Sequence, residues 1–357
     1  MHTSTTASIF SHYQQRGAKG PLIVALCLLL NGCSGFQFLY NQLDWLALNQ
    51  ANHYLNLNDQ QQQQLEKEIA QLLHWHRTTQ LIKYTQLLNE TAVRAQKPLT
   101  EADFGWAETQ MGVLYVELME PAIAPIAKVL STLDDEQIQY LSEQLSEELQ
   151  EQYEYLDYSS KKRLQHRTGQ LIDQFENGYD DLTDQQLAIL KKHAEENLDL
   201  SSLAKQYRQQ INRELIALLA APQTNNAVNL NSSQLPTQPQ HSEHSEHSEH
   251  YANIEKYLRT IWLHPETNYP AEYLQAINTT KTNYYQLMQE IHALVTPNQL
   301  QHLLETIASY NQDFMDLSSA ARTAPIALQN RPTTASIQTC TNHHKSPVSK
   351  GYRHNNC

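Results

Sequence analysis

The chain has 357 residues, of which 40% are hydrophobic and 18% charged, so it is long and apolar enough to bury a core. Its formal net charge is −13, and it becomes −15 without residues 1–32, which contain two basic and no acidic residues. So acidic a protein repels polyanions, and we expect no nucleic-acid partner. With nine glycines and 13 prolines among many Gln, Leu, Glu and Tyr residues, the composition is typical of a helical protein.

The first element, residues 1–32, has the layout of a bacterial lipoprotein signal peptide. Arg16 and Lys19 precede an apolar run of nine residues at 22–30, and the sequence Leu-Asn-Gly-Cys then ends at Cys33. The run is far shorter than the roughly 20 apolar residues of a membrane-spanning helix. We therefore predict cleavage before Cys33, acylation of Cys33 with palmitate or similar chains, and attachment to the membrane by lipid alone.

The residue after the cysteine indicates which membrane carries the anchor. Ser34 stands where an aspartate would favour retention in the inner membrane. We expect the periplasmic face of the outer membrane of a Gram-negative bacterium. The alternatives are an ordinary secretory signal and a retained anchor in which the cysteine occurs by chance.

A helix-capping pattern then recurs five times: an apolar residue, a cap residue of type Asn, Asp or Thr, and Gln or Asp three positions after the cap. The cap side chain accepts a hydrogen bond from the third backbone amide, and the third side chain accepts one from the amide of the cap. The pairs are Asn58 and Gln61, Thr100 and Asp103, Asp134 and Gln137, Thr183 and Gln186, and Thr296 and Gln299. The pattern predicts five helix starts.

Apolar residues at helical spacing predict the helices that follow these starts. The first part contains helices at 60–97, at 101–119 with an end near Pro121, a short one to Leu130, and helices at 184–197 and 200–220. Residues 135–177 form either one long helix or two helices broken near Ser159 and Ser160, with Gly178 as the terminator. No alternating strand pattern occurs. The predicted fold class is therefore all-α, an antiparallel helical bundle with long helices.

A change of composition separates the C-terminal part. Residues 222–250 are rich in Asn, Gln, Ser and Pro and end in His-Ser-Glu repeats, so we predict a disordered linker between the helical domain 33–221 and the segment 251–318. That segment has helices at 251–263, 271–294 and 297–318, which form a separate small unit or dock onto the bundle. Residues 319–357 read as a disordered tail. Its Cys340 and Cys357 either pair in an oxidising periplasm or stay unpaired.

Two histidine-rich segments raise the question of metal binding. His241, His244, His247 and His250 of the repeat would bind Zn, Ni or Cu weakly, or they belong to a solvated spacer. His343, His344 and His354 in the tail match no standard zinc spacing. A repeat without fixed geometry does not form a precise catalytic site, so we expect no resident cofactor.

The densest group of chemically reactive side chains in the helical part is His74, Trp75, His76 and Arg77. On an α-helix His74 and His76 lie about 200° apart, whereas Arg77 and Thr78 share the face of His74. The group is either a functional patch or a set of helix-packing residues. The sequence has no HExxH zinc motif, no phosphate-binding glycine loop and no nucleophile elbow, so we expect no enzymatic activity.

Several short motifs recur in a recognisable order behind Cys33. They are Tyr40, Asn41, Asp44 and Trp45 in one run, the Trp-His-Arg segment at 75–77 with Leu81 and Tyr84, and a Leu-x-x-x-Gln motif at 182–186. Over roughly residues 33–220 this series resembles an uncharacterised family of Gram-negative lipoproteins, classed as a domain of unknown function. The resemblance implies the localisation and a helical fold, but no activity.

The Leu-Thr-x-x-Gln motif that ends at Gln186, nearly repeated at 295–299, is also similar to that of small periplasmic chaperones of the envelope stress response. This similarity implies a non-enzymatic function in binding periplasmic or envelope proteins. One alternative is a structural or assembly lipoprotein with a single dedicated partner, and another is a weak metal-binding protein.

Overall fold

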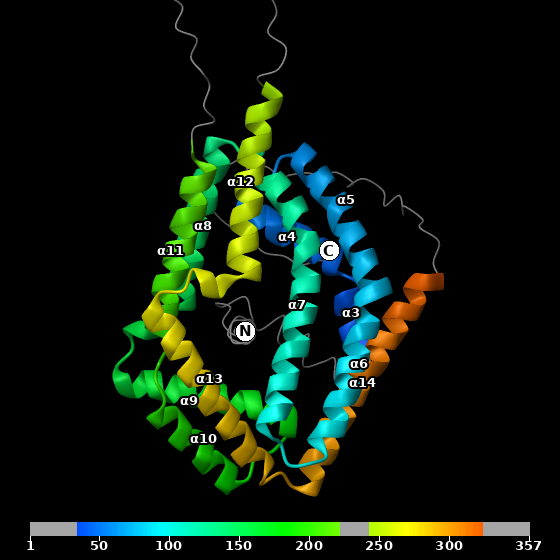
Figure 1. Ribbon diagram of the computed structural model, residues 1–357, viewed down its shortest axis with the longest axis vertical. Coiled ribbons are helices and arrows are strands. Elements are labelled where there is room, and N and C mark those ends of the chain that lie inside the picture. Colours follow the sequence, from blue (N-terminus) through cyan, green and yellow to red (C-terminus); the bar gives the residue numbers. More distant parts are fainter. Residues whose placement is uncertain (1–33, 222–242, 324–357) are drawn as a thin grey trace, which may run out of the picture. The chain divides into compact units, whose positions relative to one another are not determined.

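Helices make up all the regular structure in the part of the chain that the computed structural model describes, residues 34–221 and 243–323 (Figure 1). The all-α prediction is therefore confirmed for these residues. The first half contains α3 (Ser34–Tyr40), α4 (Leu43–Leu55), α5 (Asp59–Trp75), η1 (His76–Gln80), α6 (Leu81–Ala95), α7 (Glu101–Leu130), α8 (Asp135–Gln152) and η2 (Glu154–Asp157).

The second half continues the same architecture. It contains α9 (Ser160–Tyr179), α10 (Asp184–Glu196), α11 (Ser201–Leu219), α12 (Glu243–Leu263), η3 (Pro265–Thr267), α13 (Ala271–His292) and α14 (Pro297–Thr323). Helices begin directly after each of the five predicted cap residues, so all five predicted starts are confirmed. None of the described helices combines the length and the apolar character of a membrane span.

Helix α7 contradicts the prediction of a break near Pro121. It runs without interruption to Leu130, through both Pro121 and Pro125. A proline inside a helix removes a hydrogen bond and costs about 3 kcal/mol. The residues that follow the two prolines, Ile123 and Ala127, are fully buried in a cluster with residues of α12. Tertiary packing therefore holds the helix where local propensity would end it.

The segment from 135 to 177 follows the broken alternative, with η2 and the cap residue Ser159 between α8 and α9. Gly178 is not the terminator that the sequence predicts. Helix α9 continues to Tyr179, and Asp180 takes the positive φ of 63°. The reason is the burial of Tyr179, whose hydroxyl is 3.1 Å from Nδ1 of His292.

Both boundaries of the predicted C-terminal segment are wrong. Helix α12 begins at Glu243, so His244, His247 and His250 belong to its first turns and not to a linker that extends to 250. Helix α14 runs to Thr323, past the predicted end at 318, and Leu317 and Ser318 at that predicted end are buried. Cys33, His241, Cys340 and Cys357 lie outside the described residues, as do the rest of the predicted linker and of the tail.

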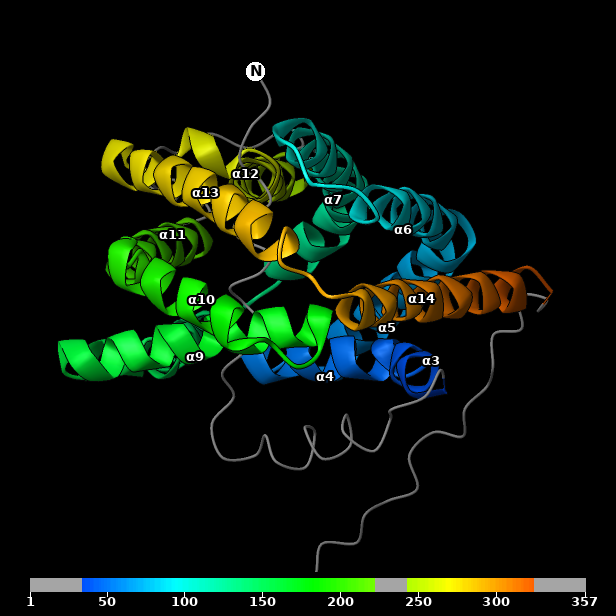
Figure 2. The same ribbon diagram turned by 90° about the horizontal axis from the view of Figure 1, so that it is seen from below.

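The C-terminal helices dock onto the bundle, as one of the two alternatives expected. In both views α14 lies beside α6, and α12 lies beside α7 (Figures 1 and 2). One core cluster contains Ile123 of α7, Leu141 of α8, Leu219 of α11, and Ile254 and Leu258 of α12. The described residues thus belong to one compact unit.

A second core cluster joins helices that are also distant in sequence. It contains Phe175 of α9, Leu190 of α10, and Leu287 and Ile291 of α13. Each such fully buried side chain contributes about 1.5–3 kcal/mol relative to its exposed state. Because α12, α13 and α14 each supply core residues, they are integral to the bundle.

Candidate functional site

The predicted patch at 74–77 lies where α5 passes into α6 through η1, a π-helix. Its wide turn is marked by the amide of Leu81, which donates to the carbonyl of His76 five residues earlier. Two threonines support it: Thr78 Oγ1 donates to the carbonyl of His74 at 2.9 Å, and Thr79 Oγ1 to that of Trp75 at 2.7 Å. Such turns recur at functional sites of helical proteins.

The wide turn places the imidazole of His76 between two tyrosines. The Tyr40 hydroxyl forms a short contact with Nδ1 of His76, and Nε2 of His76 is 3.1 Å from the Tyr84 hydroxyl. A neutral imidazole has one donor and one acceptor nitrogen, so one hydroxyl donates to the ring and the other accepts from it. Both ring nitrogens are therefore engaged. We call these three residues the Tyr-His-Tyr cluster.

Burial keeps the whole cluster uncharged. It lowers the pKa of His76 to about 4, with a smaller contribution from the charge of Arg77. It raises the pKa of Tyr40 and of Tyr84 to about 12. At neutral pH the cluster is thus a neutral imidazole between two protonated phenols, which suits a polar contact within a core.

Arg77 joins this cluster, which corrects the prediction that it shares the face of His74. Its Cζ lies 4.9 Å from the centroid of the Tyr40 ring, and its Nη2 donates to the Tyr40 carbonyl at 3.5 Å. The reason is the wide turn, which rotates Arg77 toward α3. His74 is exposed, and Trp75 is half-buried with its ring 6.4 Å from that of His76. The patch therefore divides: His76 belongs to the Tyr-His-Tyr cluster, Arg77 contacts the cluster through Tyr40, and His74 and Trp75 lie outside it.

The four residues of the N-terminal motif divide in the same way. Tyr40 is buried, whereas Asn41 is exposed in the turn between α3 and α4. Asp44 accepts a hydrogen bond from the amide of Trp45 at 2.8 Å, and the Trp45 side chain is 55% exposed. Of the four, only Tyr40 reaches the Tyr-His-Tyr cluster.

The cluster rests on a small core between α3, α6 and α14. Leu81 is fully buried there against Leu317, and Phe314 packs against both Phe36 and Tyr84. Sequence reasoning missed the polar contact beside it, in which Gln37 Nε2 donates to Asp313 Oδ1 at 2.9 Å. Asp313 is only 2% exposed. No local pattern points to this contact, because its partners are 276 positions apart.

The capping boxes form a second kind of polar site. In four of the five, the residue three after the cap is a glutamine, and each of these glutamines is buried. They face each other in two pairs. Gln61 and Gln137 exchange amide hydrogen bonds of 3.1 and 2.8 Å, and Gln186 and Gln299 exchange bonds of 3.1 and 2.9 Å. We call these the glutamine pairs.

Each glutamine pair also ties two helix starts together in the same manner. Every amide group donates to the carbonyl two positions before the cap residue of its partner: Gln61 to Thr132, Gln137 to Asn56, Gln186 to Leu294 and Gln299 to Asp181, at 3.0, 2.9, 3.4 and 2.7 Å. Every carbonyl oxygen also accepts from the amide of its own cap residue. All donors and acceptors of these buried side chains are therefore satisfied.

The fifth box is built with a carboxylate. Asp103 Oδ2 accepts from the amide and the hydroxyl of Thr100, and its Oδ1 accepts from Arg94 Nη1 at 2.7 Å. These bonds to Thr100, and then the bond to Arg94, lower the pKa of Asp103. Arg94 also lies over the ring of Trp106, 4.3 Å from its centroid.

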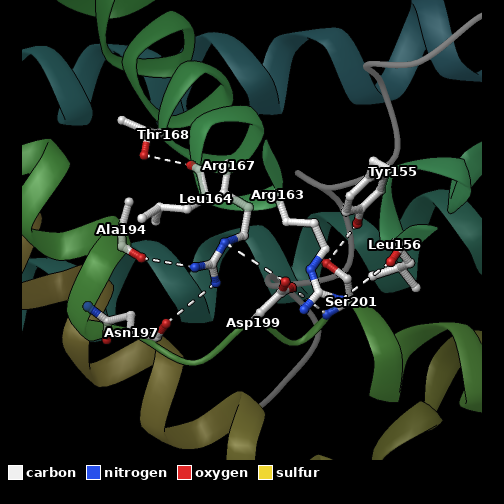
Figure 3. Close-up of polar contacts among 10 residues, drawn as sticks. All are labelled: Tyr155, Leu156, Arg163, Leu164, Arg167, Thr168, Ala194, Asn197, Asp199 and Ser201. Atoms are coloured by element: carbon white, nitrogen blue, oxygen red, sulfur yellow. Dashed lines mark hydrogen bonds and ion pairs between the residues drawn. The ribbon is translucent and has the colours of Figure 1, made fainter. Parts of the chain in front are cut away.

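A cluster around Arg167 closes the carboxyl end of α10 (Figure 3). Arg167 Nη2 donates to the carbonyl of Ala194 at 3.0 Å, and Nη1 to that of Asn197 at 3.4 Å. The carboxylate of Asp199 lies 3.9 Å from its Nε. An arginine at this place satisfies carbonyls that a helix end leaves open and suits the helix dipole. We assign it the structural role of fixing α9 to the turn between α10 and α11.

Within residues 34–221 and 243–323, no group of three or more His, Cys, Asp or Glu side chains converges as a metal site would. A family model matches residues 53–236, just over half of the chain, and its description is a family of unknown function (DUF6279). The chain belongs to this family. The matched region of DUF6279 includes Gln61, Gln137 and Gln186 but neither Tyr40 nor Gln299, so residues outside it complete the cluster and the second pair. No curated protein and no solved structure matches the chain.

Proposed function

We propose that this protein is a lipoprotein of the Gram-negative outer membrane, anchored through Cys33 on the periplasmic side, that binds other protein chains without enzymatic chemistry. The anchor is supported by the apolar run at 22–30 and the Leu-Asn-Gly-Cys sequence. The single observation that carries the binding function is a set of exposed aliphatic side chains on two paired helices.

These side chains are Ile82 and Val93 of α6 and Val113 and Val116 of α7, which we call the aliphatic row. Residues 11 positions apart on α6 and three positions apart on α7 share a helix face. Ion pairs between Lys83 and Glu117 and between Arg94 and Asp103, each 2.7 Å long, tie α6 to α7. Single exposed aliphatic residues are normal, whereas a contiguous apolar patch is typical of an interaction surface. We propose that the row forms such a patch, because Ile82 and Val116 directly precede the ion-paired Lys83 and Glu117.

In this proposal the Tyr-His-Tyr cluster has a structural role, not a catalytic one. Both nitrogens of His76 are hydrogen-bonded, and the pKa of each group keeps it neutral at physiological pH. A general base needs a free nitrogen within reach of a substrate proton. The cluster therefore fits the fixing of α3 onto the bundle better than proton transfer.

An aggregation assay tests the binding function. We expect the full-length protein, added at an equal molar ratio, to suppress the aggregation of a reduced, unfolding client protein. Val113→Ser combined with Val116→Ser should weaken this suppression at least threefold, because both side chains belong to the aliphatic row. The matched control is Leu198→Ser, which removes an exposed aliphatic side chain from the turn between α10 and α11. Equal suppression by all variants would contradict the proposal.

Crosslinking in intact cells separates a general binder from the alternative function. A protein that shields many clients should give many crosslinked bands. A structural or assembly lipoprotein with one dedicated partner should give one dominant band. Loss of either pattern in the Val113→Ser, Val116→Ser variant would place the partner at the aliphatic row.

A second candidate function is weak binding of Zn, Ni or Cu by the His-Ser-Glu repeat. The observation that favours it is the start of α12 at Glu243, because His244, His247 and His250 then recur every third residue along a helix. Calorimetry with each metal tests this proposal, with His244→Ala combined with His247→Ala as the variant. No heat of binding from the unaltered protein would remove it.

A further inference from the structure

Helices α3 and α4 expose a group of large apolar side chains within a stretch of eight residues. Phe38 is 53% exposed, Leu39 is 37% exposed, and Trp45 at the start of α4 is 55% exposed. Exposing such side chains to water costs free energy that burial elsewhere would recover. We call these three residues the N-terminal apolar face.

The rest of α3 holds this face outward. The ring of Phe36 lies 5.5 Å from that of Phe314, and Gln37 donates hydrogen bonds to Asp313 and Asp316, at 2.9 and 3.2 Å. Successive residues of a helix are rotated by about 100°, so Phe38 points about 200° away from Phe36. Rotation of α3 to bury the face would break these contacts and those of Tyr40.

The chemistry around the face suits lipid. From Ser34 to Leu43 the chain has no charged residue, and the first charge, Asp44, accepts the amide of Trp45. A surface without charges loses little hydration free energy when it enters an apolar phase. The aliphatic row differs in this respect, because the ion pair of Lys83 and Glu117 lies within it. Trp is typical of membrane interfaces, where its amphipathic ring sits at the level of the headgroups. Phe and Leu are typical of the apolar side of helices that lie in the interface.

The position of the face along the chain indicates which occupant it has. Helix α3 begins at Ser34, directly after the predicted acylated residue Cys33. At 1.5 Å per residue, Phe38 lies roughly 6 Å along α3 from its start. Amphipathic helices at membrane surfaces bury their apolar side to about 5–10 Å. The face is therefore within reach of the bilayer that holds the anchor.

We infer that Phe38, Leu39 and Trp45 form a second membrane contact that inserts into the interface of the bilayer to which Cys33 is attached. This inference rests on the proposed anchoring. A lipid anchor alone leaves a protein free to rotate about one point, whereas an inserted helix face fixes its orientation. Because α3 is fixed to α14 and to the Tyr-His-Tyr cluster, the contact sets the orientation of the helices packed around it.

Fluorescence quenching by brominated lipids tests the contact. The full-length protein is reconstituted into vesicles of phosphatidylethanolamine and phosphatidylglycerol with bromine on the acyl chains. We expect quenching of the tryptophan emission, and Trp45→Phe should reduce the quenched fraction at least twofold. The matched control is Trp106→Phe, because Trp106 lies under Arg94 on α7 and should stay unquenched. A second variant, Phe38→Ser with Leu39→Ser, should reduce the quenching of Trp45 while the helical circular dichroism stays unchanged.

Flotation of the same vesicles tests the anchoring through Cys33 separately from the membrane contact of the N-terminal apolar face. Protein that does not float with the vesicles would overturn the anchoring and this inference together. Protein that floats while its emission is unquenched would overturn the contact alone. An unquenched Trp45 that is shielded from iodide in solution would assign the face to a protein partner and would equally overturn the membrane contact.

Discussion

The glutamine pairs and the box at Thr100 begin with the same local chemistry and end with different structures. In all five boxes the third side chain accepts a hydrogen bond from the backbone amide of its own cap residue. Four of them carry glutamine and become buried crosslinks between distant helix starts. The fifth carries Asp103, stays near the surface and binds Arg94.

The difference follows from what each side chain offers. A primary amide both donates and accepts, so two amides satisfy each other and can be buried together. An ionised carboxylate only accepts hydrogen bonds, and two of them repel each other because both are negative. A single half-buried carboxylate therefore needs a cationic partner, which for Asp103 is Arg94. The local motif therefore fixes where a helix starts. Whether that start also joins two parts of the fold depends on whether the third residue carries an amide or a carboxylate.

Removal of one buried glutamine should have the largest effect. Gln186 is 0% exposed, and Gln186→Ala removes both of its bonds to Gln299 and leaves the carbonyl of Leu294 and the amide of Thr183 without this side chain. We expect a loss of about 3 kcal/mol of the free energy of unfolding. Urea denaturation measures it. Thr183→Ala removes only the cap oxygen and should cost less, about 1 kcal/mol. A loss below that of Thr183→Ala would contradict the crosslink.

A double-mutant cycle tests directly whether the two glutamines of a pair depend on each other. Its expected effect is smaller than that of Gln186→Ala. We expect Gln61→Ala and Gln137→Ala to show a coupling free energy of about 2 kcal/mol, because each removes the partner of the other. The control cycle combines Gln61→Ala with Gln186→Ala, from different pairs, and should be additive within about 0.5 kcal/mol. Additivity in both cycles would mean that the pairs do not act as units.

The aspartate box should respond less, but with a dependence on pH. Asp103→Ala removes a cap partner and should cost about 1 kcal/mol at neutral pH. Because the pKa of Asp103 is lowered in the folded protein, its contribution is present above the unfolded carboxyl pKa of about 3.9 and is lost as pH falls through the lower folded value. Melting of both proteins between pH 3 and 7 should show the difference shrinking at acid pH. A difference independent of pH would rule out an ionic role.

The smallest effect is expected at Gln185, beside the buried Gln186. Gln185 is exposed, so Gln185→Ala should change the free energy of unfolding by no more than about 0.5 kcal/mol. If the Leu-Thr-x-x-Gln motif also forms a client surface, this variant should suppress aggregation less well than the unaltered protein. Strict proportionality between activity and the folded fraction in Thr183→Ala, Gln185→Ala and Gln186→Ala would leave the motif as a helix start alone.

Local features were predictable from the sequence because their causes are local. The cap residues Asn58, Thr100, Asp134, Thr183 and Thr296 fixed the helix starts, since each pairs with a residue three positions away. The group around His76 and the motif at Tyr40 were also recognisable as unusual. Their meeting was not, because it depends on how α3 packs against α6 and α14.

Features set by long-range packing were mispredicted or missed. Pro121 predicts the end of a helix, and only the burial of Ile123 and Ala127 explains why α7 continues past it. The predicted linker ended at His250 because composition does not reveal that Ile254 and Leu258 pack on α7. Helix α12, which carries both residues, begins earlier, at Glu243. Gln186 and Gln299 are 113 positions apart, and no residue within either capping box predicts that they pair.

The π-helix between α5 and α6 predicts the effect of a one-residue change in chain length. A turn of this kind is one residue wider than an α-turn. If one residue is deleted between positions 76 and 80, the turn can become α-helical while Leu81 and Thr85 of α6 stay buried where they are. Such a deletion should keep the packing of α6 and break the contacts of His76 with Tyr40 and Tyr84.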